Sequence, residues 1–479
     1  MRKFVVIPTV ALTLALSSFG CASVAGSARP DGGFRHAWTA RLDANADSTT
    51  IVAPDVVLKN GKQIAVALVV AGNNGSDCDP SDPVSKATTY AFNALTGKRL
   101  WQKSTAGRAR CTTAAAAVWE NWVFSPGLDG KIHRYSLATG AEYRKDGWPK
   151  KFTRRPYVEK ASANLVVSAN YLYLATSGFI GDAGYYEGHV VTIDLLTNHE
   201  NVWNSLCSNV HALISEKSAS KDYCADVQAG MFGRGQGAVD PLNGDVYFAT
   251  GNGPWNGTTD WGDSVLKLTP DGSTLLDAFT PKNQDYLNSN DLDLGSTGPL
   301  ILPPVTSDGR TYHLLVQGGK GPSTSSGGPA VLWLVNRDQM STAPGPGHLG
   351  GSLQHVDSPG GCETLTAPAM WMDPEGQPVV IYANDCGAIA YTLTTSLTAA
   401  PSLVERWHFG GRSTSPVVSG DSLYIAHDGE VDIYNPSNGQ DVATTETAMG
   451  SIHWEYPAVW GKWIFMTDES ARLFAYKQG

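Results

Sequence analysis

The chain has 479 residues, of which 42% are apolar, so it can form a sizeable core. The net charge of −10 argues against a nucleic-acid binder or a polybasic membrane-surface protein, because both carry a basic surplus. The 51 glycines and 27 prolines occur together with 14 tryptophans and 18 tyrosines. This composition is typical of an ordered, turn-rich, all-β protein rather than of a disordered or collagen-like chain.

The first residues have the pattern of a secretory signal. Residues 1–21 start with a basic pair and continue with an apolar run over residues 4–16, which is too short to span a bilayer as a stable helix. Cleavage before Cys21 would give a lipid-anchored lipoprotein, whereas cleavage after one of the alanines that follow would release a soluble protein. We therefore expect export to the periplasm, the extracellular space or a lipid anchor at the cell surface, with a linker over residues 22–32.

Six cysteines remain besides Cys21, and an even number in an oxidising compartment predicts disulfide bonds. Proximity along the chain favours the pairs Cys78–Cys111, Cys207–Cys224 and Cys362–Cys386. There is no C-x-x-C motif, which excludes zinc ribbons and thioredoxin-type chemistry, and no C-x-x-C-H motif for attaching a c-type haem.

A short alternating strand that ends in a turn such as Thr-Gly or Asp-Gly recurs along the chain. Six clear copies and two weaker ones begin at Tyr90, His133, Val191, Val265, Leu332, Ile389, Val431 and Leu473. A tryptophan often follows the turn, at Trp101, Trp148, Trp203 and Trp407. The shortest repeat step is about 40 residues, enough for four short strands, so eight copies predict an eight-bladed β-propeller.

The chain ends on a strand, so we expect a strand near residues 37–42 to join the last blade and close the ring, which protects the sheet edges. Residues 33–479 contain no long helical pattern and no linker, which predicts a single domain. Residues 166–175 are expected to form one alternating strand. Insertions enlarge the blades between residues 140 and 400, and binding sites on propellers tend to lie in such loops.

This repeat resembles the quinoprotein repeat of the PQQ-dependent alcohol dehydrogenases. Their relatives include polyvinyl-alcohol dehydrogenases and the cofactor-free propeller lipoprotein of outer-membrane assembly. The resemblance covers most of the chain after residue 33 and implies an all-β, quinoprotein-like β-propeller with eight blades, closed by an N-terminal strand. It does not by itself separate an enzyme from a scaffold.

Two segments resemble the metal site of the catalytic members more closely. Residues 239–256 resemble a strand that ends in a turn carrying a calcium-binding asparagine, which implies Asn252 as a ligand. Residues 290–296 resemble the loop that holds the catalytic base, which implies Asp291 as that base and Asp293 as the extra acid of lanthanide-using members. The alternatives are an ordinary strand-end turn and a solvated acidic loop.

Two further segments imply residues that would touch the cofactor or its metal. Residues 314–338 resemble a segment whose basic residue contacts the quinone, which implies Lys320; a lysine there can stabilise developing negative charge. A calcium-binding glutamate of the family has no clean match here. Either Asp182 or Glu187 could replace it, and we favour Asp182. The alternatives are a surface lysine and an ordinary polar loop.

Two features of the dehydrogenases are missing. The adjacent Cys-Cys pair that presses on one face of the quinone is absent. Arg234 stands where the family has a tryptophan that stacks on the other face. An arginine can stack on an aromatic plane, so Arg234 is a candidate cofactor contact.

The resemblance leaves three hypotheses open. The first is an exported oxidoreductase that oxidises an alcohol or sugar with PQQ and a calcium or lanthanide ion, and passes the electrons to a separate acceptor. The second is a non-catalytic propeller that binds a protein or polymer. The third is an enzyme that uses the channel acids without PQQ. In each case a lipid anchor at Cys21 is the one membrane contact that we expect.

Overall fold

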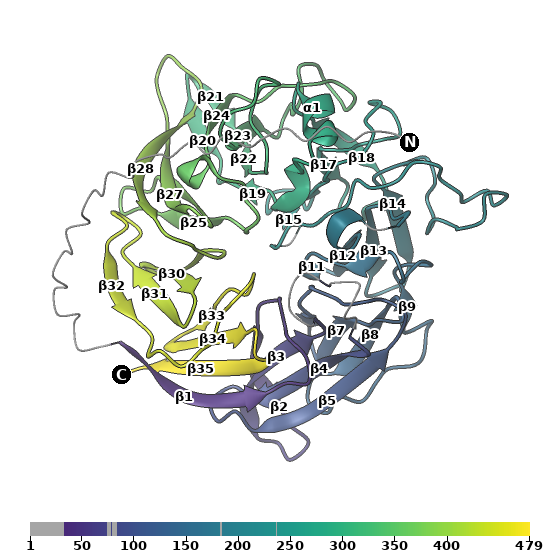
Figure 1. Ribbon diagram of the computed structural model, residues 1–479, viewed down its shortest axis with the longest axis vertical. Coiled ribbons are helices and arrows are strands. Elements are labelled where there is room, and N and C mark those ends of the chain that lie inside the picture. Colours follow the sequence, from purple (N-terminus) through teal and green to yellow (C-terminus); the bar gives the residue numbers. More distant parts are fainter. Residues whose placement is uncertain (1–32, 74–77, 79–83, 183, 236) are drawn as a thin grey trace, which may run out of the picture.

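The computed structural model describes residues 33–73, 78, 84–182, 184–235 and 237–479. Their strands form eight blade sheets arranged around a common axis (Figure 1). Seven of these sheets have four strands and one has five, and a separate hairpin is attached to the ring. The all-β, eight-bladed prediction is confirmed, whereas the predicted signal, linker and Cys21 lie outside the described residues.

The first four blades follow one another along the chain. Blade 1 contains β2 (Ile51–Val57), β3 (Gln63–Ala71), β4 (Lys86–Asn93) and β5 (Arg99–Ala106). Blade 2 contains β6 (Ala117–Trp119), β7 (Trp122–Pro126), β8 (Lys131–Ser136) and β9 (Lys150–Lys151). Blade 3 contains β10 (Lys160–Ala161), β11 (Val166–Ser168), β12 (Tyr171–Ser177), β13 (His189–Asp194) and β14 (Glu200–Asn204). Blade 4 contains β15 (Ala238–Val239), β16 (Val246–Ala249), β17 (Val265–Leu268) and β18 (Leu275–Phe279).

The other four blades complete the ring. Blade 5 contains β19 (Leu300–Ile301), β22 (Leu314–Gln317), β23 (Val331–Asn336) and β24 (Gln354–Asp357), and the hairpin β20 (Val305–Ser307) and β21 (Arg310–Tyr312) extends from it. Blade 6 contains β25 (Ala369–Met372), β26 (Pro378–Asn384), β27 (Gly387–Thr394) and β28 (Ser402–Gly410). Blade 7 contains β29 (Val417–Ser419), β30 (Ser422–His427), β31 (Glu430–Tyr434) and β32 (Asp441–Thr444). Blade 8 contains β33 (Ala458–Trp460), β34 (Trp463–Asp468), β35 (Arg472–Gln478) and β1 (Phe34–Arg41).

In the order of hydrogen-bonded strands, each repeated sequence strand lies third in its blade, and this includes the two weak copies, which lie on β23 and β27. The expectation of one strand over residues 166–175 is wrong. The chain turns at Ala169, whose φ is +50°, so that β11 pairs with β12 as a hairpin. The alternation of apolar residues continues across this turn, and it therefore conceals the break.

The ring is closed by β1, which starts and ends slightly earlier than expected. It pairs antiparallel with β35, from Phe34 opposite Gln478 to Arg41 opposite Arg472. In Figure 1 the purple N-terminal strand accordingly lies along the yellow C-terminal one. Buried side chains of blade 8, such as Phe465, pack with those of blade 1, such as Phe92, in one core. The first and last blades are thus joined by both a hydrogen-bonded ladder and apolar burial.

Tryptophans on outer strands bind the turns of the following blade. The indole of Trp101 donates to the carbonyl of Leu137 at 2.8 Å, and that of Trp407 donates to Pro436 at 2.8 Å. A Cβ on the turn glycine Gly439 would lie 2.9 Å from the Trp407 ring. The turn therefore needs a glycine both for its positive φ of 69° and for the close approach of the ring. Trp38 and Trp148 make corresponding contacts.

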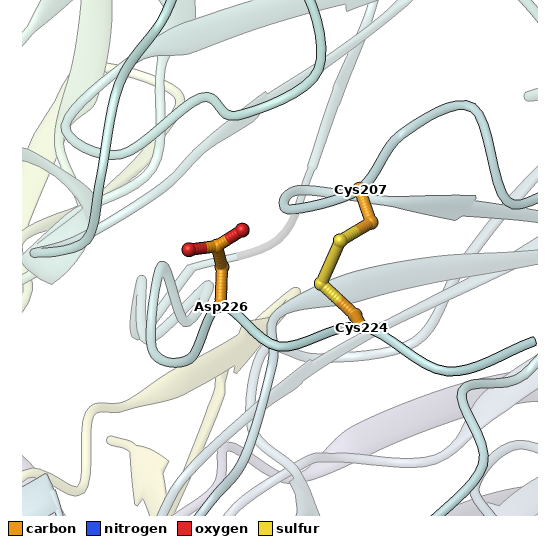
Figure 2. Close-up of side chains that lie close together, drawn as sticks. All are labelled: Cys207, Cys224 and Asp226. Atoms are coloured by element: carbon orange, nitrogen blue, oxygen red, sulfur yellow. A yellow bond between two sulfur atoms is a disulfide. The ribbon is translucent and has the colours of Figure 1, made fainter. Parts of the chain in front are cut away.

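Three disulfides join the cysteine pairs expected from sequence proximity. Figure 2 shows Asp226 beside the Cys207–Cys224 bond. Because both sulfurs are bonded to each other, this group offers no thiolate to a metal ion. Among the described residues, no helix has the length and apolarity to cross a membrane.

Candidate functional site

A cavity of about 270 Å³ collects most of the residues named from the sequence. Its lining includes Asp182, Arg234, Asp291, Asp293 and Lys320. These side chains come from four different inter-strand loops, between residues 178 and 320 of the chain. Asn252 lies against them, since its Nδ2 donates to Oδ1 of Asp291 at 2.8 Å. The fold therefore brings together side chains that the sequence separates by up to 138 positions.

Asp293 is the buried carboxylate of this group, with its side chain 9% exposed. Its Oδ1 accepts the backbone N–H of Asn252 at 2.8 Å, and its Oδ2 lies 2.5 Å from Nζ of Lys320. A Cβ on Gly251 would lie 2.2 Å from the same Oδ1. The glycine before Asn252 therefore allows the turn to approach the carboxylate closely.

Asp291 is the open carboxylate, with its side chain 73% exposed. Lys320 lies 3.9 Å from its Oδ1, on the side where Asn252 donates. The residue follows the helix α1 (Gln284–Ser289) and has a φ of +57°, which is uncommon for a residue with a side chain. One carboxylate oxygen is thus oriented by the protein, and the group stays accessible to a bound molecule.

Asn252 is 4% exposed, and its side-chain oxygen is buried with no hydrogen-bond partner among the described residues. A buried amide oxygen without a donor is costly. Amide and carboxylate oxygens are also the donors that hard cations such as calcium prefer. The unpartnered oxygen, together with Asp291 and Asp293, therefore fits a cation that would supply the missing partner.

The structure distinguishes between the two acids proposed as a further ligand. Asp182 lines the cavity and accepts the Tyr186 hydroxyl at 2.5 Å. Its pKa is raised by burial and by the charges of Asp293 and Asp291. Glu187 instead lies outside the cavity lining, with its buried carboxyl group 3.2 Å from the Arg155 guanidinium. Asp182 is therefore the one of the two that faces the candidate site.

Arg234 is placed by Trp454, a residue that sequence analysis did not single out. The guanidinium lies 4.6 Å from the centre of the Trp454 ring. Phe179 and Phe232 also line the cavity. Aromatic faces are therefore present, although they come from other positions than in the dehydrogenase family that the sequence resembles. No repeat or motif marks these residues, because they lie in loops of unrelated length.

Asp263 supports the site without lining the cavity, and sequence analysis did not single it out either. It is fully buried, accepts the backbone N–H of Leu294 at 3.1 Å and lies 3.4 Å from Nε2 of Gln284. Burial raises its pKa well above the usual range. It fixes the start of the segment that follows Asp293, so it positions the cavity acids rather than lining the cavity.

A PQQ-repeat family model, described as "Outer membrane protein assembly factor BamB", matches residues 32–246. The fold is a β-propeller similar to that of the PQQ-repeat proteins. The resemblance expected from the sequence is confirmed at this level by the family match and by similar solved structures. A search of curated proteins finds no match.

Three solved structures illustrate how widely the PQQ-type propeller is shared. The quinohemoprotein alcohol dehydrogenase ADHIIG of Pseudomonas putida HK5 has a TM-score of 0.60 at 12% identity, over 93% of this chain and 76% of that one. A europium-containing methanol dehydrogenase has a TM-score of 0.60 at 13% identity, over 93% of each chain. The quinohemoprotein alcohol dehydrogenase of Comamonas testosteroni has a TM-score of 0.57 at 13% identity, over 93% of this chain and 76% of that one. At such identities the likeness shows the fold alone.

Proposed function

We propose that this PQQ-type propeller is an oxidoreductase that oxidises an alcohol or sugar, with PQQ and a calcium or lanthanide ion bound in the cavity. The convergence of Asn252, Asp291 and Lys320 in one place carries the proposal. Had these side chains been scattered over the surface, a scaffold would have been the better interpretation. The similar structures named above include dehydrogenases of alcohols, which supports the same substrate class.

The residues present fit both groups. The oxygens of Asn252, Asp291, Asp293 and Asp182 would hold the cation. PQQ is planar and carries several carboxylates, so it needs positive partners and flat apolar faces. Positive and aromatic side chains of the cavity lining meet both needs: Lys160, Lys320, Arg234, Phe179, Phe232 and Trp454.

The chain's own residues have separable roles in this proposal. When bound, the quinone and its cation would supply the two-electron oxidant. Asp291 would take the hydroxyl proton of the substrate, because it is the accessible one of the two carboxylates beside Lys320. The amide of Asn252 holds one of its oxygens in place, and Lys320 places a positive charge beside both acids. The electrons would then leave to a separate acceptor.

The proposal is tested by titrating purified residues 33–479 with PQQ in the presence of Ca²⁺ or La³⁺, while following tryptophan fluorescence and dye reduction by a panel of alcohols and sugars. We expect saturable, cation-dependent binding. Asp291→Ala should lower dye reduction about 100-fold or more, since a general base contributes that much. Asp285→Ala, an exposed acid on α1, is the matched control and should keep full activity. If the folded protein does not bind PQQ in the presence of either cation, the proposal is wrong.

One observation favours a second candidate, a non-catalytic propeller that binds a protein or polymer. The family model that matches residues 32–246 is that of an assembly factor rather than an enzyme. If the protein does not bind PQQ, the next test would be whether the immobilised protein retains partner proteins or polymers. The same Asp291→Ala variant would serve as a control. An enzyme that uses the cavity acids without PQQ would instead turn over substrate in the cofactor-free titration.

We also propose that the protein is exported, as the signal pattern and the three disulfides suggest. Mass spectrometry of the mature N-terminus separates the two routes. A diacylated Cys21 would give a lipid anchor, whereas an unmodified start at a later residue would give a released protein. An intracellular protein that still begins at Met1 would contradict export.

A further inference from the structure

A second cluster of titratable side chains lies where the ring closes. Asp47 lies between β1 and β2, His453 precedes β33, and Glu469 lies in the turn between β34 and β35. One potential ligand atom from each of these three residues lies within 4.8 Å of the other two. The cluster thus joins segments from the two ends of the described chain. It is distinct from the cavity acids, although Arg234, which lines the cavity, lies 3.9 Å from Oδ2 of Asp47.

Glu455 belongs to the same cluster. It is completely buried, and its Oε2 accepts the backbone N–H of His453 at 2.6 Å. Its Oε1 and the Oε1 of Glu469 are both buried and have no hydrogen-bond partner among the described residues. Buried carboxylate oxygens without a donor are costly, which favours a ligand bound by these groups.

Asp47 supplies an independent sign of a missing ligand. Its side chain has no exposed surface. One oxygen, Oδ2, accepts the amide of Asn73, while Oδ1 is buried and has no hydrogen-bond partner among the described residues. Buried carboxylate oxygens are normally satisfied by donors or by a metal, so the unpartnered oxygen points to a bound cation.

The charges of the cluster do not balance. Asp47, Glu455 and Glu469 would together carry three negative charges. The guanidinium of Arg234 and the imidazole of His453 lie beside them, each 3.9 Å from Oδ2 of Asp47. Burying unbalanced charge is unfavourable unless a counterion enters.

We propose that Asp47, His453 and Glu469, assisted by Glu455, bind a divalent transition-metal ion of the zinc or manganese type. An imidazole nitrogen among carboxylates favours such an ion over calcium or magnesium, which prefer oxygen ligands alone. The cation proposed for the cavity has oxygen ligands only and is therefore of a different class. A metal here would link the first inter-blade segment to the last blade, and its binding would stabilise the closed ring.

The test uses the Asp291→Ala protein, so that loss of the cavity cation or of PQQ binding does not affect the result. The protein is stripped with EDTA and titrated with ZnCl₂ and with MnCl₂, while thermal unfolding and bound metal per chain are measured. We expect one bound ion and a rise in Tm of about 2–4 °C at a hundredfold excess over Kd. Asp47→Asn and His453→Ala should each abolish the bound ion and the shift. Asp226→Asn, at the group shown in Figure 2, is the control and should keep both.

The opposite result is equally clear. If neither metal binds the stripped protein and neither raises Tm, the proposal is wrong. Should Asp47→Asn fail to fold, Glu469→Gln takes its place, and the metal count of the parent protein decides the question without any variant.

Discussion

Gly251 shows how little room the candidate site leaves. A methyl group there would meet Oδ1 of Asp293, the oxygen that also accepts the N–H of Asn252. We predict that Gly251→Ala lowers the affinity for Ca²⁺ or La³⁺ at least about tenfold, because the carboxylate must move away from its partners. Isothermal titration calorimetry measures the effect.

A matched alanine substitution separates this steric effect from a general effect of losing a glycine. Gly410→Ala is suitable, since its nearest contact would be 3.8 Å away. It should leave cation affinity unchanged. Equal losses in the two variants would mean that the close contact at Gly251 does not position Asp293.

Glu187, which does not face the cavity, is predicted to govern part of the pH dependence of stability. Burial raises its pKa from 4.5 to about 8, in spite of the nearby Arg155. The folded protein therefore holds a proton that the unfolded chain releases, so its contribution to stability is full below pH 4.5 and is lost as the pH rises to about 8. Urea unfolding at pH 5, 7 and 9 should show this fall, and Glu187→Gln should flatten it. An unchanged slope in Glu187→Gln would contradict the assignment.

At the residue scale, sequence analysis found the acids and the lysine of the site because the short segments around them resemble motifs of the dehydrogenase family. It could not choose firmly between Asp182 and Glu187, since the choice depends on the path of the backbone after β12. The aromatic wall of Phe179, Phe232 and Trp454 was missed for a related reason. Loops of unequal length bring these rings together, and no spacing in the sequence reflects that.

At the scale of elements, the tryptophan that follows the turn links one blade to the next. Trp407 on β28 is buried against the turn of blade 7 and donates to Pro436. We predict that Trp407→Ala lowers the free energy of unfolding by about 3–5 kcal/mol, through lost burial and a cavity. Equilibrium urea unfolding measures the loss.

Trp407→Phe is the control for the hydrogen bond. It keeps an aromatic ring over Gly439 and loses the indole N–H, so it should cost less than the alanine variant. A Phe variant that is as unstable as the Ala variant would show that the hydrogen bond, rather than burial of the ring, links the two blades.

The repeat predicted the third strand of all eight blades because glycine turns and docking tryptophans impose a pattern on the sequence there. The remaining strands are shorter and vary in their partners. The hairpin β11–β12 was taken as a single strand, since apolar residues alternate across its turn at Ala169. The hairpin β20–β21 and the helix α1 lie in the insertions, where no repeat constrains the sequence.

At the scale of the molecule, the eight-bladed ring and its closure could be predicted because both follow from the repeat number and from the strand at the chain's end. The cluster of Asp47, His453 and Glu469 could not. Asp47 is more than 400 positions from the other two in sequence, and it meets them only when the ring has closed. Long-range contacts of this kind leave no local pattern.

The closing strand is predicted to be essential for a soluble ring. Deleting residues 33–41 exposes the edge of β35, which can then pair with other chains. We expect oligomers or aggregates in size-exclusion chromatography. Arg35→Ala removes an exposed side chain and keeps the ladder, so this variant should elute like the parent protein. A deletion variant that stays monomeric and fully cooperative would show that the ladder is dispensable.

Ring closure between β1 and β35 also determines the order of folding events during synthesis. The partner of β1 is synthesised more than 400 residues later, and at about 5–20 residues per second the wait is roughly 20–90 s. During that interval β1 is an unpaired strand, and the closing step has to bring together segments that are distant in the sequence, which slows folding. Blade 8 can therefore form only after the other seven blades have been synthesised.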